Sequence, residues 1–264
     1  MRAIMNLFAP LGMGFAAAVA LTPAAAQPVT ERAFFEELPV VLSPSRMPQS
    51  LRDTPGAVTV LDREFIRATG YRDVPSLLKL VPGFSVVRER GGIADVTYHG
   101  LGSSYPNRMQ VLIDGRSVYS PYFVGGVDWF ALPLTIDEIE RIEVLRGSNS
   151  ATYGSNAAMG VVNIVTRAGG EAPGADASLA LGSPALGDAG FNYAMRSGNL
   201  GLRVNAKTRY DHGFDTLVDS PRNGVVTLRA DYRLSRRDEF SVSAGYNDAR
   251  RGMGYAGDPV NSNG

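Results

Sequence analysis

Four acidic residues that lie close together in the sequence are the first candidates for chemistry, namely Asp137, Glu138, Glu140 and Glu143. Two carboxylates can act as general acid and general base when both side chains reach the same substrate. Glu140 and Glu143 are three residues apart in a predicted strand, however, so their side chains point to opposite faces. We therefore predict no catalytic role for these carboxylates.

Other kinds of reactive site are not predicted either. The sequence has no Cys, and its two histidines, His99 and His212, are far apart, which leaves neither a thiolate site nor a histidine cluster for a metal. There is no Ser/His/Asp order, and the glycines at 91–92 and 100–102 lack the strand-to-helix context of a nucleotide-binding loop. The sequence predicts a protein that is not an enzyme and has no metal site and no cofactor.

The charge balance narrows the range of partners. The 264 residues include 26 Lys and Arg against 26 Asp and Glu, so the formal net charge is zero. Without a basic excess or a long basic run, we predict no nucleic-acid partner. A content of 44% hydrophobic and 20% charged residues is typical of a folded chain, and the length allows one large or two modest domains.

The segment 139–167 holds the elements that position the acidic residues. Apolar strands are predicted at Ile142–Leu145 and Val161–Val165, with a loop of Gly, Ser, Asn and Tyr between them. Glu143 and Arg146 bring charge into or beside the first strand, and charge on a buried strand needs partners. A strand, a tight loop and a second strand are therefore expected here.

The preceding residues predict a small α+β domain. Asp62 and Asp73 are expected to cap two short helices, of which the first ends at Gly70 and the second at Pro82-Gly83. A hairpin is expected to turn at Asp114-Gly115 within Met109–Ser120. Further strands are predicted at Gly56–Leu61, Phe84–Val87 and Asp95–Tyr98, and the second helix turns Val74, Leu77, Leu78 and Val81 toward the core.

These motifs together resemble the plug domain of TonB-dependent outer-membrane receptors. The matching residues are Leu80–Phe84, Met109–Gly115, Arg146-Gly147, Tyr153-Gly154 and Gly160–Thr166. Ser148 replaces a usual Pro, Met159 a usual Gly, and His99 the Arg of a usual Arg-Gly pair. The resemblance implies a plug domain at 54–170, a small mixed sheet with two short helices, in which Arg108 could make the plug-to-barrel contact that His99 lacks.

The amino terminus adds an export signal and a candidate coupling strand. Met1–Ala26 has the order of a secretory signal, with Arg2, an apolar run and Ala24–Ala26 before the expected cleavage. In the flexible segment 27–53, an isolated Pro-flanked strand can join the edge of another protein's sheet. The resemblance identifies this strand as the TonB box, which binds TonB and through it the inner-membrane proton-gradient complex; its residues are Leu38, Pro39, Val40, Val41, Leu42 and Ser43.

From residue 175 the pattern changes to long alternating strands. In Leu200–Tyr210 and Val226–Leu234 one face is apolar and the other polar, which is typical of a membrane barrel wall with lipid outside and a wet lumen inside. Long connections are expected at 183–190, at 212–224 and from 248 onward, and short ones at 197–199 and 235–239. Five such strands cannot close, so we expect 175–264 to be the first antiparallel strands of an incomplete barrel, 22-stranded in the resembled family, and the chain to be part of a longer receptor.

The expected function is active uptake of a scarce, bulky ligand such as a siderophore, a cobalamin-like compound or an oligosaccharide, in the bacterial outer membrane, with the plug within the barrel on the periplasmic side. Ion pairs of Glu143 and Arg146 are expected across the plug and barrel boundary. A passive porin or surface receptor without energy coupling, and a secreted plug-like binding module, remain as alternatives. The loop residues expected to face the ligand are Arg90, Ser104, Tyr105, Asn107, Tyr119, Tyr122 and Phe123.

Overall fold

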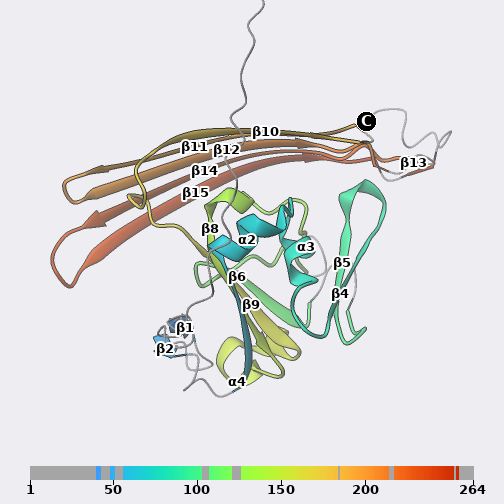
Figure 1. Cartoon of the computed structure of the whole chain (residues 1–264). Coiled ribbons are helices and arrows are strands. Elements are labelled where there is room, and N and C mark those ends of the chain that lie inside the picture. Colours follow the sequence, from blue (N-terminus) through green and yellow to red (C-terminus); the bar gives the residue numbers. More distant parts are fainter. Residues whose placement is uncertain are drawn as a thin grey trace, which may run out of the picture. The chain divides into compact units, whose positions relative to one another are not determined.

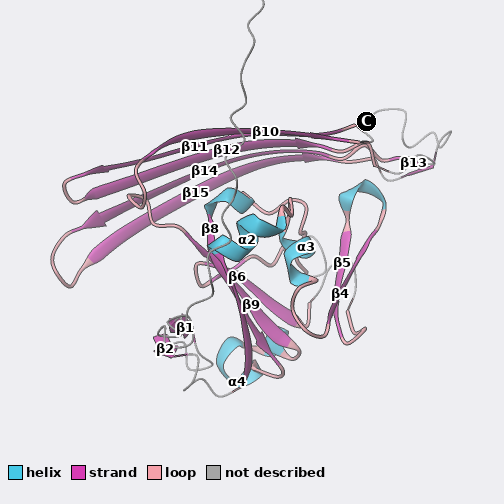
Figure 2. Ribbon diagram, viewed as in Figure 1, coloured by secondary structure: helices cyan, strands magenta, loops and turns pink. Residues whose placement is uncertain are grey.

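Two five-stranded sheets, one mixed and one antiparallel, contain most of the strand residues of the described chain (Figures 1 and 2). The computed structural model describes residues 40–42, 48–50, 56–102, 107–120, 126–183, 185–213, 217–252 and 254–255. The expected signal sequence at Met1–Ala26 lies outside these residues. Residues Leu38–Gly264 cluster as one compact unit that contains both sheets.

The mixed sheet belongs to the α+β domain and has the strand order β3-β8-β9-β6-β7. Its strands are β3 (Ala57–Asp62), β8 (Ile139–Arg146), β9 (Gly160–Thr166), β6 (Met109–Ile113) and β7 (Arg116–Ser117). Strand β6 runs parallel to β9, and the other pairs are antiparallel. The predicted strands and the Asp114-Gly115 hairpin are thus confirmed.

Two short helices follow the capping pattern of the sequence. Helix α2 (Arg63–Thr69) begins after Asp62, whose carboxylate accepts from the Phe65 amide, and ends at Gly70 with φ 65°. Helix α3 (Val74–Leu78) begins after Asp73, whose carboxylate accepts from the Ser76 amide. Capping oxygens satisfy amides that the first turn leaves unpaired, so the helix starts are set locally.

Smaller elements complete the α+β domain. Strands β4 (Phe84–Arg88) and β5 (Ala94–Tyr98) form a hairpin around the short helix η1 (Arg90–Gly92), and η3 (Ile136–Glu138) precedes β8. The segment between β8 and β9 was predicted to be a loop, but it contains α4 (Ser150–Tyr153) and η4 (Ser155–Ala157). Each makes a single turn, which needs little helix propensity because Asn149 and Gly154 carbonyls close it locally.

The core of this domain lies between the mixed sheet and the two helices. Leu77, Leu78 and Val81 are buried at the predicted helical spacing, although α3 itself ends at Leu78. They pack with Ile142, Val144, Val162 and Ile164 of the central strands. Burial of several such side chains contributes about 1.5–3 kcal/mol each, which is the main stabilisation of the domain.

The antiparallel sheet, called here the long-strand sheet, has the order β10-β11-β12-β14-β15. Its strands are β10 (Gly174–Gly182), β11 (Leu186–Ser197), β12 (Leu200–Tyr210), β14 (Arg222–Arg233) and β15 (Glu239–Arg250). Two further pairs of short strands are present. One joins β13 (Leu217–Val218) to β16 (Gly254–Tyr255), and the other joins β1 (Val40–Leu42) to β2 (Pro48–Ser50). The five strands confirm the predicted number.

The connections differ from the prediction at three places. The segment 183–190 was expected to be a long loop, yet β10 turns into β11 within 183–185, and Gly187 and Gly190 pair on both sides. Strand β14 begins at Arg222, before the expected start, and β15 continues to Arg250, past the expected loop start at 248. Glycine and aspartate were interpreted as loop residues, but pairing with neighbouring strands keeps them extended. Gly187 and Gly190 pair with β10 and β12, and Asp248 pairs with β14.

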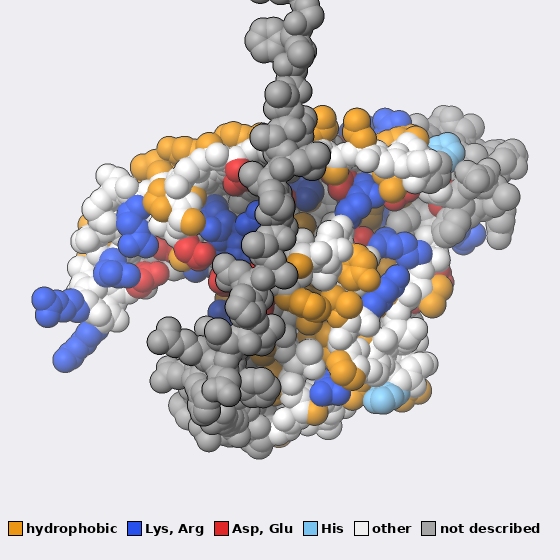
Figure 3. All heavy atoms as spheres, viewed as in Figure 1, with side chains coloured by type: hydrophobic (Ala, Val, Ile, Leu, Met, Phe, Trp, Pro, Cys, Tyr) orange, Lys and Arg blue, Asp and Glu red, His pale blue; other side chains and the backbone are white. Residues whose placement is uncertain are grey.

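The two faces of the long-strand sheet have opposite chemistry, as the alternation predicts. Leu228, Tyr232 and Phe240 are exposed, whereas Arg203 and Asn205 are buried. Hydrophobic side chains line the upper margin of Figure 3, over these strands. The polar face was expected to face the lumen of the barrel, and part of it is buried against the α+β domain. Within the part of the chain that the structure describes, no helix is long and apolar enough to cross a membrane.

A close backbone approach connects the two sheets. The segment after β9 passes β12 so closely that a Cβ on Gly201 would collide with the backbone nitrogen of Gly170. Only glycine permits this approach, because any side chain would push the segment away from the strand. The chain leaving the α+β domain is therefore held against the long-strand sheet.

Candidate functional site

Three polar clusters join the α+β domain to the buried face of the long-strand sheet. The Asp73 cluster comprises Arg72, Asp73, Arg88, Asp188 and Arg209. The Glu138 cluster comprises Asp137, Glu138, Asn205, Lys207 and Thr227. The Asp114 cluster comprises Asp114, Thr166, Gly169, Arg229 and Asp231. Each contains residues from both parts, so any movement of the domain away from the sheet must break these contacts.

The Asp73 cluster begins with a two-point ion pair from the start of α3 to β11. Arg72 donates from Nε and Nη2 to the two carboxylate oxygens of Asp188, at 2.6 and 2.5 Å. Such a planar pair is stronger and more directional than a single contact. The hydrogen bond to Asp188 raises the pKa of Arg72, so the guanidinium stays charged.

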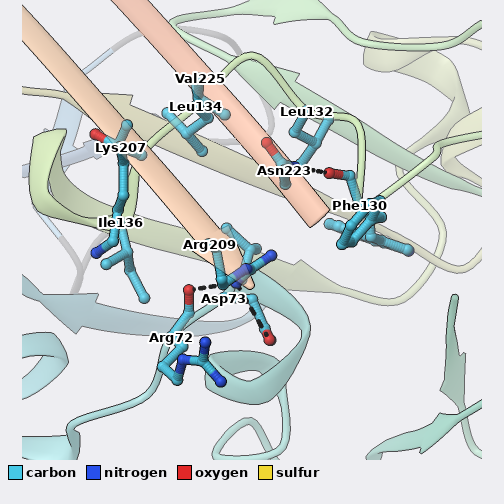
Figure 4. A pocket seen from close by; sticks show the side chains of 13 residues that line it. Arg72, Asp73, Phe130, Leu132, Leu134, Ile136, Lys207, Arg209, Asn223 and Val225 are labelled. Atoms are coloured by element: carbon cyan, nitrogen blue, oxygen red, sulfur yellow. Dashed lines mark hydrogen bonds and ion pairs between the residues drawn. The ribbon is translucent and has the colours of Figure 1, made fainter. Parts of the chain in front are cut away.

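Asp73 connects the cap of α3 to β12 (Figure 4). Its carboxylate accepts from Arg88 and lies 3.7 Å from Nη1 of Arg209, which also donates to the Arg72 carbonyl at 2.7 Å. Burial alone raises the pKa of Asp73, but Arg88, Arg209 and the hydrogen bonds from Ser76 and Arg88 hold it below its usual value. The carboxylate is therefore a charged centre that attaches a helix to the sheet.

Phe130 lies beside this cluster, and two guanidinium groups lie close to its ring. Its ring centroid is 5.9 Å from the guanidinium carbon of Arg209 and 5.6 Å from that of Arg251. Asn223 donates to the Phe130 carbonyl, and Arg251 also pairs with Asp128 (Figure 4 shows the Asn223 contact). Cation-to-ring contacts of this kind contribute about 0.5–2 kcal/mol each. They therefore help to hold the segment around Phe130 against the long-strand sheet.

In the Glu138 cluster a buried carboxylate forms hydrogen bonds with two long strands, β12 and β14. Glu138 accepts from Thr227 Oγ1 at 2.6 Å, from Asn205 Nδ2 at 3.0 Å and from the Thr135 amide. Burial raises the pKa of Glu138, and the hydrogen bonds from Thr227 and Thr135 oppose that rise. Beside it, Lys207 Nζ donates to Asp137 at 2.7 Å. Neighbouring residues of η3 thus contact three residues of the long-strand sheet, namely Asn205, Lys207 and Thr227.

The Asp114 cluster connects the hairpin turn to the segment that leaves the domain. Asp114 accepts from the amide and hydroxyl of Thr166 at 2.8 and 2.6 Å. Arg229 of β14 donates to the same hydroxyl at 2.8 Å and to Asp231 at 3.1 Å. Asp231 in turn accepts from the Gly169 amide at 2.6 Å. This cluster therefore attaches the segment after β9, where the chain leaves the α+β domain, to the long-strand sheet.

Glu143 and Arg146, which were predicted to form ion pairs across the boundary, both lie in β8 of the mixed sheet. Glu143 is fully buried in the mixed sheet, where its carboxylate accepts from Arg141 at 2.7 Å and from Asn163 at 3.0 Å. Arg146 lies at the end of β8, in register with Ala57 and Gly160. Ion pairs across the boundary are formed by Arg72, Asp137, Asp114 and Asp128. A role of Glu143 and Arg146 in such pairs stays a prediction.

The predicted ligand-facing residues are only partly described. Arg90 is exposed in η1, next to Gly91, whose amide donates to Asp219 of the long connection after β12. Asn107 is exposed beside β6. Tyr119 is half-buried, its hydroxyl donates to the Met109 carbonyl at 2.5 Å, and burial raises its pKa to about 12, so this hydroxyl is already engaged within the domain. Ser104, Tyr105, Tyr122 and Phe123 lie outside the described residues.

The candidate coupling strand is also described in part. Val40–Leu42 form β1, whose register pairs Val41 with Gln49 of β2. Leu38, Pro39 and Ser43 lie outside the described residues. Among the described residues, no group of three or more His, Cys, Asp or Glu side chains could hold a metal ion.

The sequence patterns did not identify the residues of the three clusters as an interface between the α+β domain and the long-strand sheet. Asp137 and Glu138 were considered as carboxylates for catalysis, and Arg203 to Arg209 as a lumen-facing row. One signal was available in the sequence. A strand face that carries several charges needs charged or polar partners if another domain covers it. The sequence did not identify which residues of the α+β domain would be the partners.

The sequence of this chain is similar to those of known proteins. The family model described as TonB-dependent Receptor Plug Domain matches residues 50–161. The chain is 33% identical over 214 residues to the vitamin B12 transporter BtuB of Vibrio vulnificus, covering 78% of this chain and 34% of the relative. It is 29% identical over 218 residues to an iron-regulated outer membrane virulence protein of Vibrio cholerae, covering 79% of this chain and 29% of that protein.

Solved structures agree in fold. The outer-membrane ferripyoverdine receptor of Pseudomonas aeruginosa superposes with a TM-score of 0.65 at 19% identity, over 79% of this chain and 27% of that one. The chain thus spans about a third of the length of the relatives that it matches.

Proposed function

Because the chain belongs to the TonB-dependent outer-membrane receptors and carries their plug domain, we propose that it is the part of such a receptor that couples ligand binding to energised uptake. Its place is the bacterial outer membrane, with the plug inside the barrel and the long-strand sheet as part of the barrel wall. The α+β domain is called the plug from here on.

The observation that supports this function best is the opposite chemistry of the two faces of the wall. The apolar face carries Leu228, Tyr232 and Phe240 at exposed positions, which suits contact with acyl chains. The polar face meets the plug through charged and hydrogen-bonded clusters rather than through an apolar core. A polar interface can be broken and re-formed with water as the substitute partner, which an apolar core does not allow as easily.

For the ligand, we propose a scarce, bulky compound such as a ferric siderophore, a cobalamin-like molecule or an oligosaccharide. Relatives of this chain are a vitamin B12 transporter by name and a ferric enterobactin receptor by name, at 33% and 26% identity. Arg90 and Asn107 are exposed, and Arg90 lies beside the long connection after β12. Together with the expected loop residues Ser104, Tyr105, Tyr119, Tyr122 and Phe123, they are our proposed ligand contacts.

For energy coupling, we propose that the segment Leu38–Ser43 joins a strand of TonB. Its central part is extended in β1, so the backbone has the conformation that strand addition needs. Ligand binding would be coupled to exposure of this segment through the plug, which joins the two sites. The relatives are receptors and transporters by name, which supports a role without catalysis.

We expect uptake by the complete receptor to require the proton gradient. Cells that express it would be given labelled vitamin B12 or ferric enterobactin, with the gradient intact or collapsed by a protonophore. Accumulation should stop when the gradient is collapsed, while binding at the cell surface continues. Accumulation that continues unchanged would contradict the proposal and favour a passive porin or an uncoupled surface receptor.

A further inference from the structure

The turn that joins β14 to β15 carries an unusual concentration of positive charge. Residues 233–238 read Arg-Leu-Ser-Arg-Arg-Asp, and the arginines Arg233, Arg236 and Arg237 are exposed. Basic side chains project from the left end of the sheet in Figure 3. Three guanidinium groups so close together repel one another, so an anionic partner would stabilise the turn.

The hydrogen bonds of the turn leave two of these arginines available. Ser235 Oγ donates to the Asp238 carboxylate at 2.7 Å and accepts from the amides of Arg237 and Asp238 at 3.0 and 3.1 Å. Asp238 is therefore engaged inside the turn, and Glu239 lies 3.9 Å from Arg233. Among the residues that the structure describes, neither Arg236 nor Arg237 forms an ion pair.

An apolar and aromatic patch adjoins the charged turn on the outer face of the wall. Leu200, Tyr232 and Phe240 occupy facing positions on three adjacent strands. Phe240 is 67% exposed and Leu234 is 72% exposed, so the patch has no cover from the described chain. Aromatic residues next to positive charge are typical of the boundary between acyl chains and headgroups.

Connection lengths assign this end of the wall to the periplasmic side. The turns at 198–199 and 234–238 lie at the same end of the strands, because the strands alternate in direction. The other end carries the short turn between β10 and β11 and the longest of these connections, 211–221. Outer-membrane barrels have short periplasmic turns and longer extracellular loops, so the arginine turn faces the inner leaflet.

From this arrangement we propose that the turn is a binding site for an anionic phospholipid in the periplasmic leaflet. Arg236 and Arg237 bind the headgroup phosphate, since a guanidinium matches phosphate oxygens with two parallel hydrogen bonds. The acyl chains lie along Leu234, Phe240 and Tyr232. The proposal rests on the membrane position of the wall and is independent of the transported ligand and of TonB.

The test measures lipid binding to the complete purified receptor. The delipidated receptor is titrated with phosphatidylglycerol, phosphatidylethanolamine or lipid A in detergent, and bound lipid is counted by native mass spectrometry. The double variant R236Q/R237Q is compared with R222Q/R250Q, which removes the same charge from exposed arginines at the opposite end of the same strands. Unaltered heat-modifiable migration on gels shows that each barrel is folded.

The wild type should bind phosphatidylglycerol in preference to phosphatidylethanolamine. R236Q/R237Q should weaken phosphatidylglycerol binding about thirtyfold, whereas R222Q/R250Q should change it by less than about threefold. Equal effects of the two pairs, or equal binding of the two phospholipids, would overturn the proposal. A larger loss for lipid A than for phosphatidylglycerol would also overturn it, because it would place the turn in the outer leaflet. Loss of this site with normal uptake leaves the proposed transport function intact.

Discussion

Replacing Val40 by proline in the complete receptor should abolish energised uptake while leaving ligand binding at wild-type affinity. Proline removes the amide hydrogen of residue 40 and fixes its φ, so strand β1 can no longer donate that hydrogen bond to a partner strand. Strand addition depends on such main-chain bonds rather than on side chains. The measurement is accumulation of labelled vitamin B12 or ferric enterobactin in energised cells, beside surface binding at equilibrium.

Two controls separate the coupling role from local damage. Val40→Ile keeps the amide and the strand preference and should transport normally. Gln49→Pro disturbs the partner strand β2, which pairs with β1 in the chain, without altering the proposed coupling segment. Normal transport by Val40→Pro, or equal loss in Val40→Pro and Gln49→Pro, would show that residues 38–43 do not act through strand addition.

Replacing Asp73 should loosen helix α3 and its attachment to the wall. Asp73→Ala removes a helix cap, which costs about 1 kcal/mol, and leaves Arg209 beside a partly buried gap without its anion. Breaking buried ion pairs costs about 3–5 kcal/mol; because Arg88 is exposed to solvent, we expect a combined loss near 3 kcal/mol. Hydrogen exchange of the α3 amides in the folded receptor should then be about 100-fold faster.

Asparagine and a second cap provide the matched comparison. Asp73→Asn keeps a capping oxygen and loses the charge, so its effect should fall between those of Asp73→Ala and the wild type. Asp62 caps α2 and forms no ion pair among the described residues, so Asp62→Ala should speed exchange in α2 by only about fivefold. Equal effects of alanine at the two positions would contradict a role of Asp73 beyond capping.

The same interaction predicts a dependence on pH. The pKa of Asp73 in the folded plug is lowered below the ordinary value of 3.8, although burial alone would raise it. Its contribution to stability is present above the unfolded pKa and is lost as pH falls through the lowered folded value. Protection of the α3 amides, measured relative to the intrinsic exchange rate at each pH, should therefore fall below about pH 4 in the wild type and less so in Asp73→Asn.

Local signals in the sequence predicted most of the plug. The caps at Asp62 and Asp73, the stop at Gly70 and the Asp114-Gly115 turn depend on residues a few positions apart, so one sequence suffices to find them. The alternation in β12 and β14 likewise follows from side-chain period. The prediction was wrong at 183–190, where Gly187 and Gly190 lie in a strand because neighbours on both sides supply the hydrogen bonds.

The interface could not be predicted in the same way. Arg72 and Asp188 are 116 positions apart, and Glu138 and Thr227 are 89 apart. Their pairing depends on how the plug packs against the wall, which no local pattern contains. For the same reason the sequence did not identify Arg72, Asp114 or Asp128, which form ion pairs across the boundary.

The most direct test of this account uses spin labels at two neighbouring wall positions, Thr227 and Leu228, in the complete receptor in bilayers. Thr227 is buried against the plug, and Leu228 is 41% exposed on the opposite face. Collision with oxygen, which concentrates in acyl chains, should be strong at 228 and weak at 227, and a water-soluble nickel complex should reach neither label. Strong nickel collision at 228, or equal oxygen collision at both positions, would show that this sheet is not a membrane wall around the plug.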